Sequence, residues 1–460
     1  MKRRNLFLMF VAIAGLSLVS TGTSPAQEIP MRARTLDPST KTTFVHLGNG
    51  EPGVLYEPKD PGPKAQVAIL AMHTANDFLN HSACFELSKR GYRVLCVNDS
   101  NSKSGEFNDG ILDKVILQAK AAVVYLRKYP GVKKVVLWGH SGGATLMTAY
   151  EAIAENGVKF CQDDAKIAKC PNSLANLPPA DGVILGDANW GLSLITLLGI
   201  DPAVISNDNG MKLNPDLDMF NPANGFNPAG SHYSDAFLQK FQTAQGKRNN
   251  SLVKLALERS AAIKAGQGMY SDNEPFFIAG AFYGENKLYP TDMHLFSHTE
   301  KPWPLLHPDG SITTEIVHSV RVPTVKESPT RTYRAILKTT VNSYLSTYAV
   351  RVTDDYGYDE TTLHGIEWNS SWSNNPGNAD GITIPFLTMG MTGSFEAASA
   401  ETIHNHLKSA DKTLVYVEGA THGYETCKRC EKTPGQYGDT VKTIYDYADG
   451  WLSKSGRFIQ

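Results

Sequence analysis

Gly139, Ser141 and Gly143 form the pattern G-x-S-x-G, which is the spacing that a nucleophilic serine requires. An apolar run, VVLW, ends just before this pattern, and a segment with helical character, ATLMTAYEAIA, begins just after it. A serine on such a strand-to-helix turn has a strained backbone and an exposed hydroxyl. The flanking glycines have no Cβ and leave room for the close approach of the chain. We predict that Ser141 is a catalytic nucleophile.

A serine becomes reactive only when a base takes its proton, and histidine has a suitable pKa for that role at neutral pH. The chain has thirteen histidines, so position along the chain must decide among them. His422 follows a short apolar segment, 413–417, and precedes Gly423. We predict that His422 is the base. The alternative, a surface histidine in a loop, would leave Ser141 without an activator.

Alternating strands and helices must hold these residues in place. The apolar segments that predict buried strands are 66–72, 93–98, 135–138 and 181–187. The segments that predict helices between and after them are 78–90, 111–127 and 144–154. This order predicts a parallel sheet with helices on both faces, whose ligand sites lie beyond the carboxyl ends of the strands. The residues expected together at that edge are His73, Asn98, Ser141 and Asp187.

The same alternation resumes near the C-terminus. Two short strands are also expected before the first segment of the alternating pattern, at 42–46 and 53–56. The late segments are strands at 384–389 and 413–417 and helices at 400–407 and 437–452. Nearly two hundred residues separate the two blocks, with an irregular stretch at 207–230 and helices expected at 236–244, 252–265 and 332–348. The last of these is expected to return the chain to the sheet.

The first residues have the three regions of a secretory signal peptide. Lys2, Arg3 and Arg4 precede an apolar run at 6–19, and small residues at 24–26 offer a cleavage site. The apolar run is short for a membrane span, so no stable membrane anchor is expected. Removal of three cations changes the formal net charge from −2 to −2 − 3 = −5. This mild negative charge does not favour binding to nucleic acid. We expect a secreted or periplasmic protein.

Six cysteines are compatible with disulfide bonds in an exported protein. Cys161 and Cys170 bracket a polar loop, and Cys427 and Cys430 form C-x-x-C, so a bridge is expected within each pair. A single C-x-x-C without a second pair is weak evidence for zinc or for redox chemistry. The remaining pair, Cys84–Cys96, is expected as two buried thiols or a third bridge.

The serine turn and the alternating elements at 66–189 and 384–456 resemble the α/β-hydrolase family. The resemblance implies an α/β fold with a mostly parallel central sheet flanked by helices, and a chain order of serine, acid and histidine that agrees with His422. It also implies that the intervening segment forms a cap, which we expect to be largely helical. The resulting division is a signal peptide at 1–26, the first part of the core at 27–190, the cap at 191–328 and the second part of the core at 329–460.

The expected cap is rich in aromatic residues. Most of them must form a small core of the cap itself, and a few could line an apolar pocket above the site. They include Trp190, Phe226, Tyr233, Phe276, Phe277, Phe282, Tyr283, Trp303, Trp368 and Trp372. We therefore expect the cap to select the substrate.

Two carboxylates are candidates for the residue that orients His422. In the family the acid usually lies about three residues beyond the glycine that ends the penultimate strand. That glycine is Gly390, but Gly393 stands three residues on, and Glu396 is the nearest acid. The other known place is the end of the strand after the nucleophile helix, which Asp187 occupies. We prefer Asp187 and keep Glu396 as the alternative; Asp187 could instead be a helix cap or brace a loop.

An oxyanion hole needs two backbone N–H donors. Gly142, directly after the nucleophile, is expected to supply the first. The second should come from the loop after the strand at 66–72. The family usually has His-Gly there, whereas this chain has His73, Thr74 and Ala75. We predict Ala75 as the second donor, with Thr74 as the next choice and His73 as a structural residue.

No metal or other cofactor is expected. Asp292, His294 and His298 form only a loose metal-binding pattern, because a zinc site needs three or four ligands in firm geometry. The phosphate-binding pattern G-x-x-x-x-G-K-[ST] does not occur in the sequence. The expected chemistry uses protein side chains alone.

These residues predict a secreted serine hydrolase that cleaves a carboxylic ester through an acyl-enzyme intermediate. The expected partner is a small-molecule ester, for which bulky or aromatic groups are compatible with the aromatic cap. The same residues could instead cleave an amide or a lactone or transfer an acyl group, because the fold does not determine the substrate. A non-catalytic binding protein is the alternative from another class, and the presence of both Ser141 and His422 argues against it.

Overall fold

The computed structural model describes residues 35–48, 50–100, 112–205, 212–281, 287–324 and 336–459. The predicted leader at 1–26, Phe282, Tyr283 and the predicted cap boundary at Ser328 lie outside these ranges. Residues 37–460 form one compact unit, to which all the elements below belong. Within the described ranges, no helix is long and apolar enough to cross a membrane.

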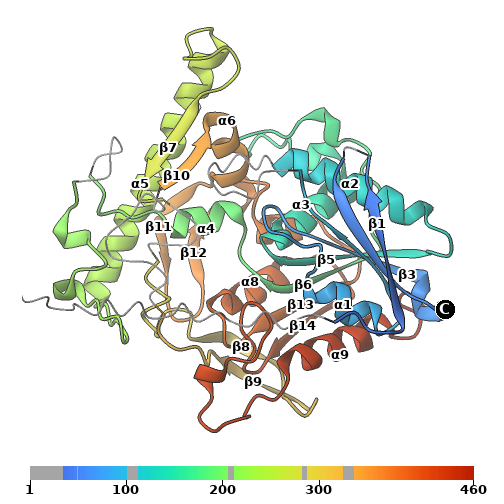
Figure 1. Cartoon of the computed structure of the whole chain (residues 1–460). Helices are drawn as coiled ribbons and strands as arrows, with labels where there is room; N and C mark the ends of the chain where they lie inside the picture. Colours follow the sequence, from blue (N-terminus) through green and yellow to red (C-terminus); the bar gives the residue numbers. More distant parts are fainter. Residues whose placement is uncertain are drawn as a thin grey trace, which may run out of the picture. The chain divides into compact units, whose positions relative to one another are not determined.

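A ten-stranded sheet runs through this unit in the order β1-β2-β4-β3-β5-β6-β13-β14-β8-β9 (Figure 1). Neighbouring strands are parallel from β4 to β8, whereas β1, β2 and β9 pair with antiparallel neighbours. The strands are β1 (Thr40–His46), β2 (Pro52–Pro58), β3 (Val67–Met72), β4 (Arg93–Val97), β5 (Lys134–Ser141), β6 (Gly182–Ala188), β8 (His298–Leu306), β9 (Ile312–His318), β13 (Phe386–Met391) and β14 (Lys412–Val417). The predicted parallel sheet is therefore present.

Helices cover both faces of this sheet, because its central strands are apolar on both sides. Leu137 of β5 belongs to the apolar core that contains residues of α2 and α3, and the next residue, Trp138, stacks on Tyr445 of α9 at 5.3 Å between ring centroids. On that second face, α1 packs against α9. The flanking helices are α1 (Ser82–Ser88), α2 (Leu112–Lys128), α3 (Gly142–Asn156), α7 (Asn375–Ala379), α8 (Ala398–His406) and α9 (Thr440–Leu452).

The segment between β6 and β13 is less helical than predicted. It contains two two-stranded antiparallel sheets, β7 with β10 and β11 with β12. Besides β8, β9, α7 and three short 3-10 helices, the described part of this segment contains α4 (Leu192–Leu198), α5 (Asp235–Lys264), β7 (Pro275–Ala279), β10 (Ile336–Thr340), α6 (Val341–Ser343), a π-helical turn (Tyr344–Tyr348), β11 (Val352–Tyr358) and β12 (Leu363–Ile366). As predicted, it has an aromatic core of its own, which includes Trp190 and Tyr233.

Helix α5 joins the two helices predicted at 236–244 and 252–265 into one. The polar residues between them bond to the backbone of neighbouring segments: Gln245 Nε2 donates to the Ile200 carbonyl at 2.8 Å, and Asn249 Nδ2 to the Val350 carbonyl at 2.8 Å. Gly246 lies against Tyr356, where a Cβ would come within 2.9 Å of the ring. Tertiary contacts therefore outweigh the weak helix propensity of these residues.

The helix predicted at 332–348 is wrong for residues 336–340 and is present at 341–348, as α6 and the π-helical turn. Residues 336–340 form β10, which pairs with β7 from Ile336 opposite Ala279 to Thr340 opposite Pro275. Ile336, Thr339 and Thr340 are β-branched, and such side chains favour a strand once a partner strand is available. This segment continues the insertion and does not return the chain to the central sheet.

The predicted cap boundaries also differ from the structure. Strands β8 and β9, inside the predicted cap at 191–328, extend the central sheet beyond β14. Pro302 and Pro304 make β8 difficult to recognise from the sequence. Proline has no N–H for the hydrogen bonds between strands and is typical of sheet edges. Residues 336–366, predicted as core, instead form the small strands of the insertion.

Three disulfides join all six cysteines, and no free cysteine remains. Cys161–Cys170 and Cys427–Cys430 are the two predicted bridges. The third, Cys84–Cys96, joins α1 to β4 on the face that α9 also covers, which decides between the two predicted alternatives. Such bridges are typical of an oxidising compartment.

Candidate active site

Ser141 lies at the junction of β5 and α3, where the chain turns sharply. Its φ of 54° and ψ of −128° are unusual for a residue with a side chain. Backbone strain of this kind costs about 1–3 kcal/mol and persists only when the surrounding structure enforces it. Helix α3 begins at Gly142, so the free N–H groups of its first turn lie beside the serine.

Close packing explains the two glycines of G-x-S-x-G. A Cβ on Gly139 would lie 2.8 Å from the Cα of Ala144, and a Cβ on Gly143 would lie 2.6 Å from the carbonyl oxygen of Met72. Both contacts are with backbone atoms that cannot move aside cheaply. The glycines therefore let α3 turn back against β3 and β5, which is the geometry that the sequence pattern predicts.

His422 and Asp187 are hydrogen-bonded to each other, although 235 positions separate them in the chain. His422 Nδ1 lies 2.7 Å from Asp187 Oδ2, and the backbone N–H of Met391 donates to Asp187 Oδ1 at 3.0 Å. The Asp187 side chain is fully buried, whereas 41% of the His422 side chain is exposed. Asp187 also has a positive φ of 44°. A buried carboxylate that accepts from Nδ1 orients the imidazole and leaves Nε2 to take a proton.

The structure places the alternative acid, Glu396, in different surroundings. Glu396 lies in the 3-10 helix Phe395–Ala397, and its backbone N–H donates to Ser394 Oγ. Burial, and then the charge of Glu396, raise the pKa of Tyr289, a residue of the aromatic core of the insertion. The contact of Asp187 with His422 therefore favours Asp187 as the acid.

A short closed loop carries His422. The backbone N–H of Thr421 donates to the Glu425 carbonyl at 2.8 Å, and that of Cys427 donates to the Gly419 carbonyl at 2.8 Å. The Cys427–Cys430 bridge closes the chain directly after these bonds. This loop follows β14 and holds His422 at the carboxyl edge of the sheet.

The loop after β3 lies against the start of α3, as an oxyanion hole requires. A Cβ on Gly142 would lie 2.9 Å from Thr74 Oγ1 and 3.1 Å from two ring atoms of His73. The Ala75 amide, however, donates to His73 Nδ1 at 3.0 Å, as does the Asn76 amide. The prediction of Ala75 as the second donor is therefore wrong, because its N–H is already used. Thr74, the second choice, remains as the candidate beside Gly142.

His140 is a feature of the site that the sequence did not reveal. Its Nε2 lies 2.7 Å from the carbonyl oxygen of His422, and the two rings are 4.7 Å apart. Burial, followed by the neighbouring rings of His422, His81 and His73, holds the pKa of His140 well below its usual value. A neutral imidazole here can donate to the carbonyl of His422 and support its loop. The only signal in the sequence is the position of His140 directly before Ser141.

Tyr424 packs under the same loop. Its ring lies 4.8 Å from that of His140, and its hydroxyl lies 3.3 Å from the carbonyl oxygen of Gly186. A Cβ on Gly186 would come within 2.1 Å of this hydroxyl. The absence of a Cβ on Gly186, the residue before Asp187 in the chain, therefore leaves room for the Tyr424 hydroxyl.

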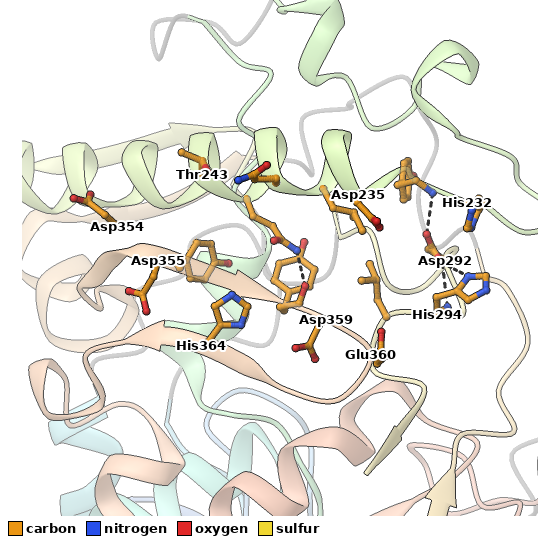
Figure 2. Close-up of a pocket in the computed structure, with 17 residues that line it drawn as sticks. His232, Asp235, Thr243, Asp292, His294, Asp354, Asp355, Asp359, Glu360 and His364 are labelled. Carbon is orange, nitrogen blue, oxygen red and sulfur yellow. Dashed lines mark hydrogen bonds and ion pairs between the residues drawn. The ribbon is translucent and has the colours of Figure 1, made fainter. Parts of the chain in front are cut away.

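The insertion contains a separate cavity of about 530 Å³ between α5 and the β11–β12 hairpin (Figure 2). Its lining is rich in acidic groups and histidines. These are Asp235, Asp292, Asp354, Asp355, Asp359 and Glu360, with His232, His294 and His364. Of the aromatic residues predicted for the cap, Tyr233 lines this cavity.

No protein-family model matches the sequence, and no curated protein matches it. Among solved structures, the chain is similar to the α/β hydrolase GrgF from Penicillium sp. sh18, with 12% identity, a TM-score of 0.40 and coverage of 91% of this chain and 99% of that chain. It is also similar to brefeldin A esterase, a bacterial homologue of human hormone-sensitive lipase, with 10% identity, a TM-score of 0.36 and coverage of 92% and 79%. A hypothetical protein from Pseudomonas aeruginosa has 10% identity, a TM-score of 0.41 and coverage of 91% and 95%.

The fold assignment depends on the geometry of this chain. Eight consecutive strands of the sheet have the order β1-β2-β4-β3-β5-β6-β13-β14, with helices on both faces. The strained Ser141 stands between β5 and α3, and Asp187 and His422 follow it in the chain order of the family. On these grounds the chain has the fold of the α/β-hydrolases.

Proposed function

We propose that this protein is a serine hydrolase that cleaves a carboxylic ester. The observation that carries the proposal is the hydrogen bond of 2.7 Å between His422 Nδ1 and the buried Asp187, at the same sheet edge as the strained Ser141. An oriented imidazole and a partly exposed serine on a strand-to-helix turn are the parts that nucleophilic acyl transfer needs.

In the first half of the proposed reaction, Ser141 Oγ attacks the carbonyl carbon while His422 Nε2 takes the hydroxyl proton. The carbonyl oxygen becomes an oxyanion, which accepts hydrogen bonds from the amides of Gly142 and Thr74. The bond to the leaving alkoxy group then breaks, and His422 returns the proton to that oxygen. The products are the alcohol and an acyl ester of Ser141.

In the second half, a water molecule gives one proton to His422 and attacks the acyl carbon. The tetrahedral intermediate collapses, the bond to Ser141 Oγ breaks and His422 protonates this oxygen. The carboxylic acid leaves, and the enzyme is restored. Asp187 stabilises the imidazolium in both halves without itself taking the proton.

A substrate panel tests the reaction class. Purified protein is assayed with matched esters, lactones and amides, beside Ser141→Ala. We expect ester hydrolysis that Ser141→Ala removes. Faster turnover of a lactone or an amide than of every ester would replace the ester with that class, and turnover unaffected by Ser141→Ala would reject the serine mechanism.

We also propose that the insertion selects the substrate by size. It carries an aromatic core of its own, which includes Trp190 and Tyr233. A shortened insertion that leaves β8 and β9 in the central sheet should change KM and the preference between large and small esters more than it changes turnover of a small ester. An unaltered preference in a folded, shortened protein would reject this role of the insertion.

Export by the leader at 1–26 remains a prediction, supported by three disulfides. Expression with the leader should give a protein that begins near Gln27, with six cysteines that resist alkylation until reduction. Intact mass before and after reduction decides this. Retention of the leader or six free thiols would contradict it.

A further inference from the structure

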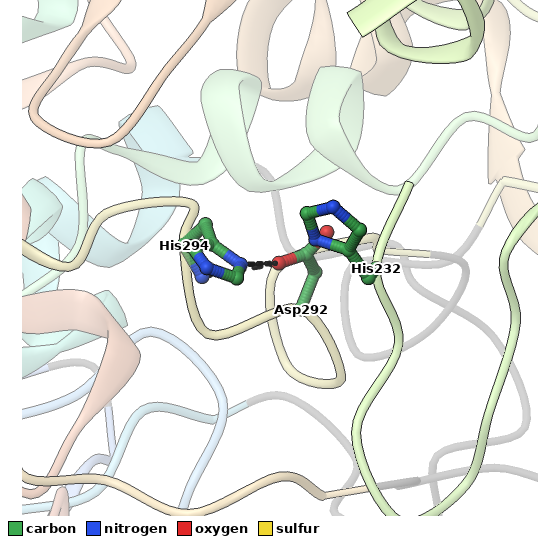
Figure 3. A group of neighbouring side chains, drawn as sticks. All are labelled: His232, Asp292 and His294. Atoms are coloured by element: carbon green, nitrogen blue, oxygen red, sulfur yellow. Dashed lines mark hydrogen bonds and ion pairs between the residues drawn. The ribbon is translucent and has the colours of Figure 1, made fainter. Parts of the chain in front are cut away.

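We propose that His232, Asp292 and His294 form a binding site for a divalent transition metal ion, for which zinc is the best match. Each of the three side chains offers one ligand atom, and these atoms lie within 4.8 Å of one another. Figure 3 shows the two imidazole rings on either side of the Asp292 carboxylate. The site lies in the insertion and goes beyond the proposed hydrolase function.

Asp292 is the fixed member of the cluster. Its side chain is 2% exposed, and both oxygens accept backbone hydrogen bonds: Oδ2 from Tyr233 at 3.0 Å and Oδ1 from His294 at 3.0 Å. A carboxylate has about four lone-pair sites, so positions for a cation remain after these bonds. The cluster therefore has a ligand whose orientation is set before a metal arrives.

Hydrogen bonds of the residues on either side of His232 attach it to the segment that contains Asp292. The amide of Ser231 donates to the Thr291 carbonyl at 2.9 Å, and the amide of Tyr233 donates to the Asp292 carboxylate. The residue between these two bonds is held next to Asp292 although 60 positions separate them in the chain. Such long-range pairing gives the cluster two ligand segments with a defined separation.

The spacing of the ligand atoms suits a tetrahedral ion. His294 Nδ1 lies 3.1 Å from Asp292 Oδ1. Two ligand atoms on one zinc ion with bonds of about 2.05 Å are about 3.3 Å apart in a tetrahedron. The ring centroids of His232 and His294 lie 4.9 Å apart, and 75% of the His294 side chain is exposed. A small rotation of the imidazole rings can therefore bring a nitrogen of each histidine to the same ion.

The ligand types select among cations. Two imidazoles with one carboxylate suit zinc and related transition metals, whereas calcium and magnesium prefer oxygen ligands. Three protein ligands leave a fourth position for water or another donor. All three residues line the acidic cavity of Figure 2, and its other carboxylates, among them Asp235 and Asp359, increase the local concentration of cations.

The loose sequence pattern of Asp292 and His294 contained His298, on which no metal site was predicted. In the structure, His298 Nδ1 lies 3.0 Å from the Thr299 carbonyl and its ring lies 5.4 Å from that of His318. The tertiary structure instead brings His232 next to Asp292 and His294. The proposal thus departs from the expectation that the protein holds no metal.

Equilibrium dialysis of the untagged full-length mature protein against zinc tests the site. We expect one zinc ion per chain at this site and a loss of affinity of more than about 10-fold in His232→Ala and in His294→Ala, because even changes beyond the direct ligands cost 10- to 100-fold. His298→Ala is the matched control and should bind as the wild type does. Since no substrate is present, the result does not depend on the proposed hydrolase function.

Cobalt provides a spectroscopic readout of the same site. Addition of cobalt should give absorption bands of low-coordinate cobalt that His294→Ala lacks, and an excess of magnesium should not remove them. Wild-type affinity for zinc in the double variant His232→Ala/His294→Ala would overturn the proposal. So would equal competition by magnesium, which would indicate nonspecific attraction to the acidic cavity.

Discussion

Two aspartate–histidine pairs in this molecule share their chemical groups and differ in their surroundings. At the sheet edge, Asp187 Oδ2 lies 2.7 Å from His422 Nδ1; in the insertion, Asp292 Oδ1 lies 3.1 Å from His294 Nδ1. Both carboxylates are buried, at 0% and 2% exposure, while the imidazoles are 41% and 75% exposed. In each pair a fixed carboxylate therefore orients a more accessible imidazole.

The third group beside each pair determines its chemistry. His422 shares the sheet edge with Ser141, whose strained turn sets its hydroxyl beside the N-terminus of α3. His294 lies beside a second imidazole, that of His232, and both line an acidic cavity. The first arrangement suits proton transfer to and from a nucleophile, and the second suits a cation. The comparison teaches that an aspartate–histidine contact alone does not identify a catalytic site.

Removal of the proposed nucleophile, Ser141, should have the largest effect, because only the pair at the sheet edge shares that edge with such a serine. Ser141→Ala is expected to lower kcat for the best ester by at least about 10⁴-fold. The reason is that no other group can form the acyl intermediate. Steady-state kinetics measure the loss, and circular dichroism checks that the variant folds. A folded variant with more than a few per cent of wild-type turnover would show that Ser141 is not the nucleophile. The pair at the sheet edge would then no longer differ in this respect from the pair in the insertion.

The next effect separates the two candidate acids. Asp187→Asn should lower kcat by at least about 100-fold, because it removes the charge that stabilises the imidazolium of His422. Glu396→Gln is the matched control and should lower kcat far less. Thermal unfolding must first show that both variants fold, since Asp187 also accepts a hydrogen bond from the backbone of Met391. A folded, active Asp187→Asn beside an inactive Glu396→Gln would reverse the assignment.

Two disulfides offer a smaller and more selective effect. Removal of Cys427–Cys430 should cost on the order of 2 kcal/mol of unfolding free energy, and removal of Cys161–Cys170 on the order of 3, because the latter closes the longer loop. Only the first bridge follows the loop of His422, so only its loss should also lower kcat severalfold. Urea unfolding and kinetics of the two double cysteine-to-serine variants measure both quantities. Equal kcat in the two variants would show that the first bridge does not support His422.

The smallest effect concerns pH. The folded protein holds the pKa of His140 well below the unfolded value of about 6.5, so the unfolded state binds the extra proton first as the pH falls. The contribution of neutral His140 to the unfolding free energy is therefore fully present above about pH 6.5, and below that pH it decreases by up to about 1.4 kcal/mol per pH unit. His404, whose pKa burial lowers to about 4, acts in the same direction.

His140→Gln should therefore weaken the dependence of unfolding free energy on pH between about 6.5 and 4.5. Urea unfolding at several pH values measures this slope for both proteins. An unchanged slope in the variant would show that His140 is not the group that opposes protonation. The activity of the variant tests separately whether its contact with the His422 carbonyl matters.

The sequence predicted the core of the fold because its signals are local. Each central strand is a short apolar run next to a helix with a regular apolar period, and β3, β5 and β6 lie within a residue or a few of the predicted bounds. The insertion depends on pairing between distant segments. Strand β10 needs β7 as a partner, and β8 contains prolines that argue against a strand, so neither could be recognised alone.

The candidate site shows the same division. Ser141 was recognisable from its local turn, and Asp187 from its place at a strand end. The orientation of the Ala75 amide toward His73 and the contact of His140 with the His422 carbonyl are decided by three-dimensional packing. The place of His232 beside Asp292 has the same origin, because hydrogen bonds between two distant loops create it.

Covalent labelling by a fluorophosphonate tests the central claim most directly. Peptide mapping of the labelled wild-type protein should show one adduct per chain, on Ser141. The adduct should be absent from Ser141→Ala and should form at least about 100-fold more slowly in Asp187→Asn, because the imidazole has lost its orienting charge. An adduct on a different residue, or a folded wild-type protein that does not react, would contradict the assignment of Ser141 as the nucleophile.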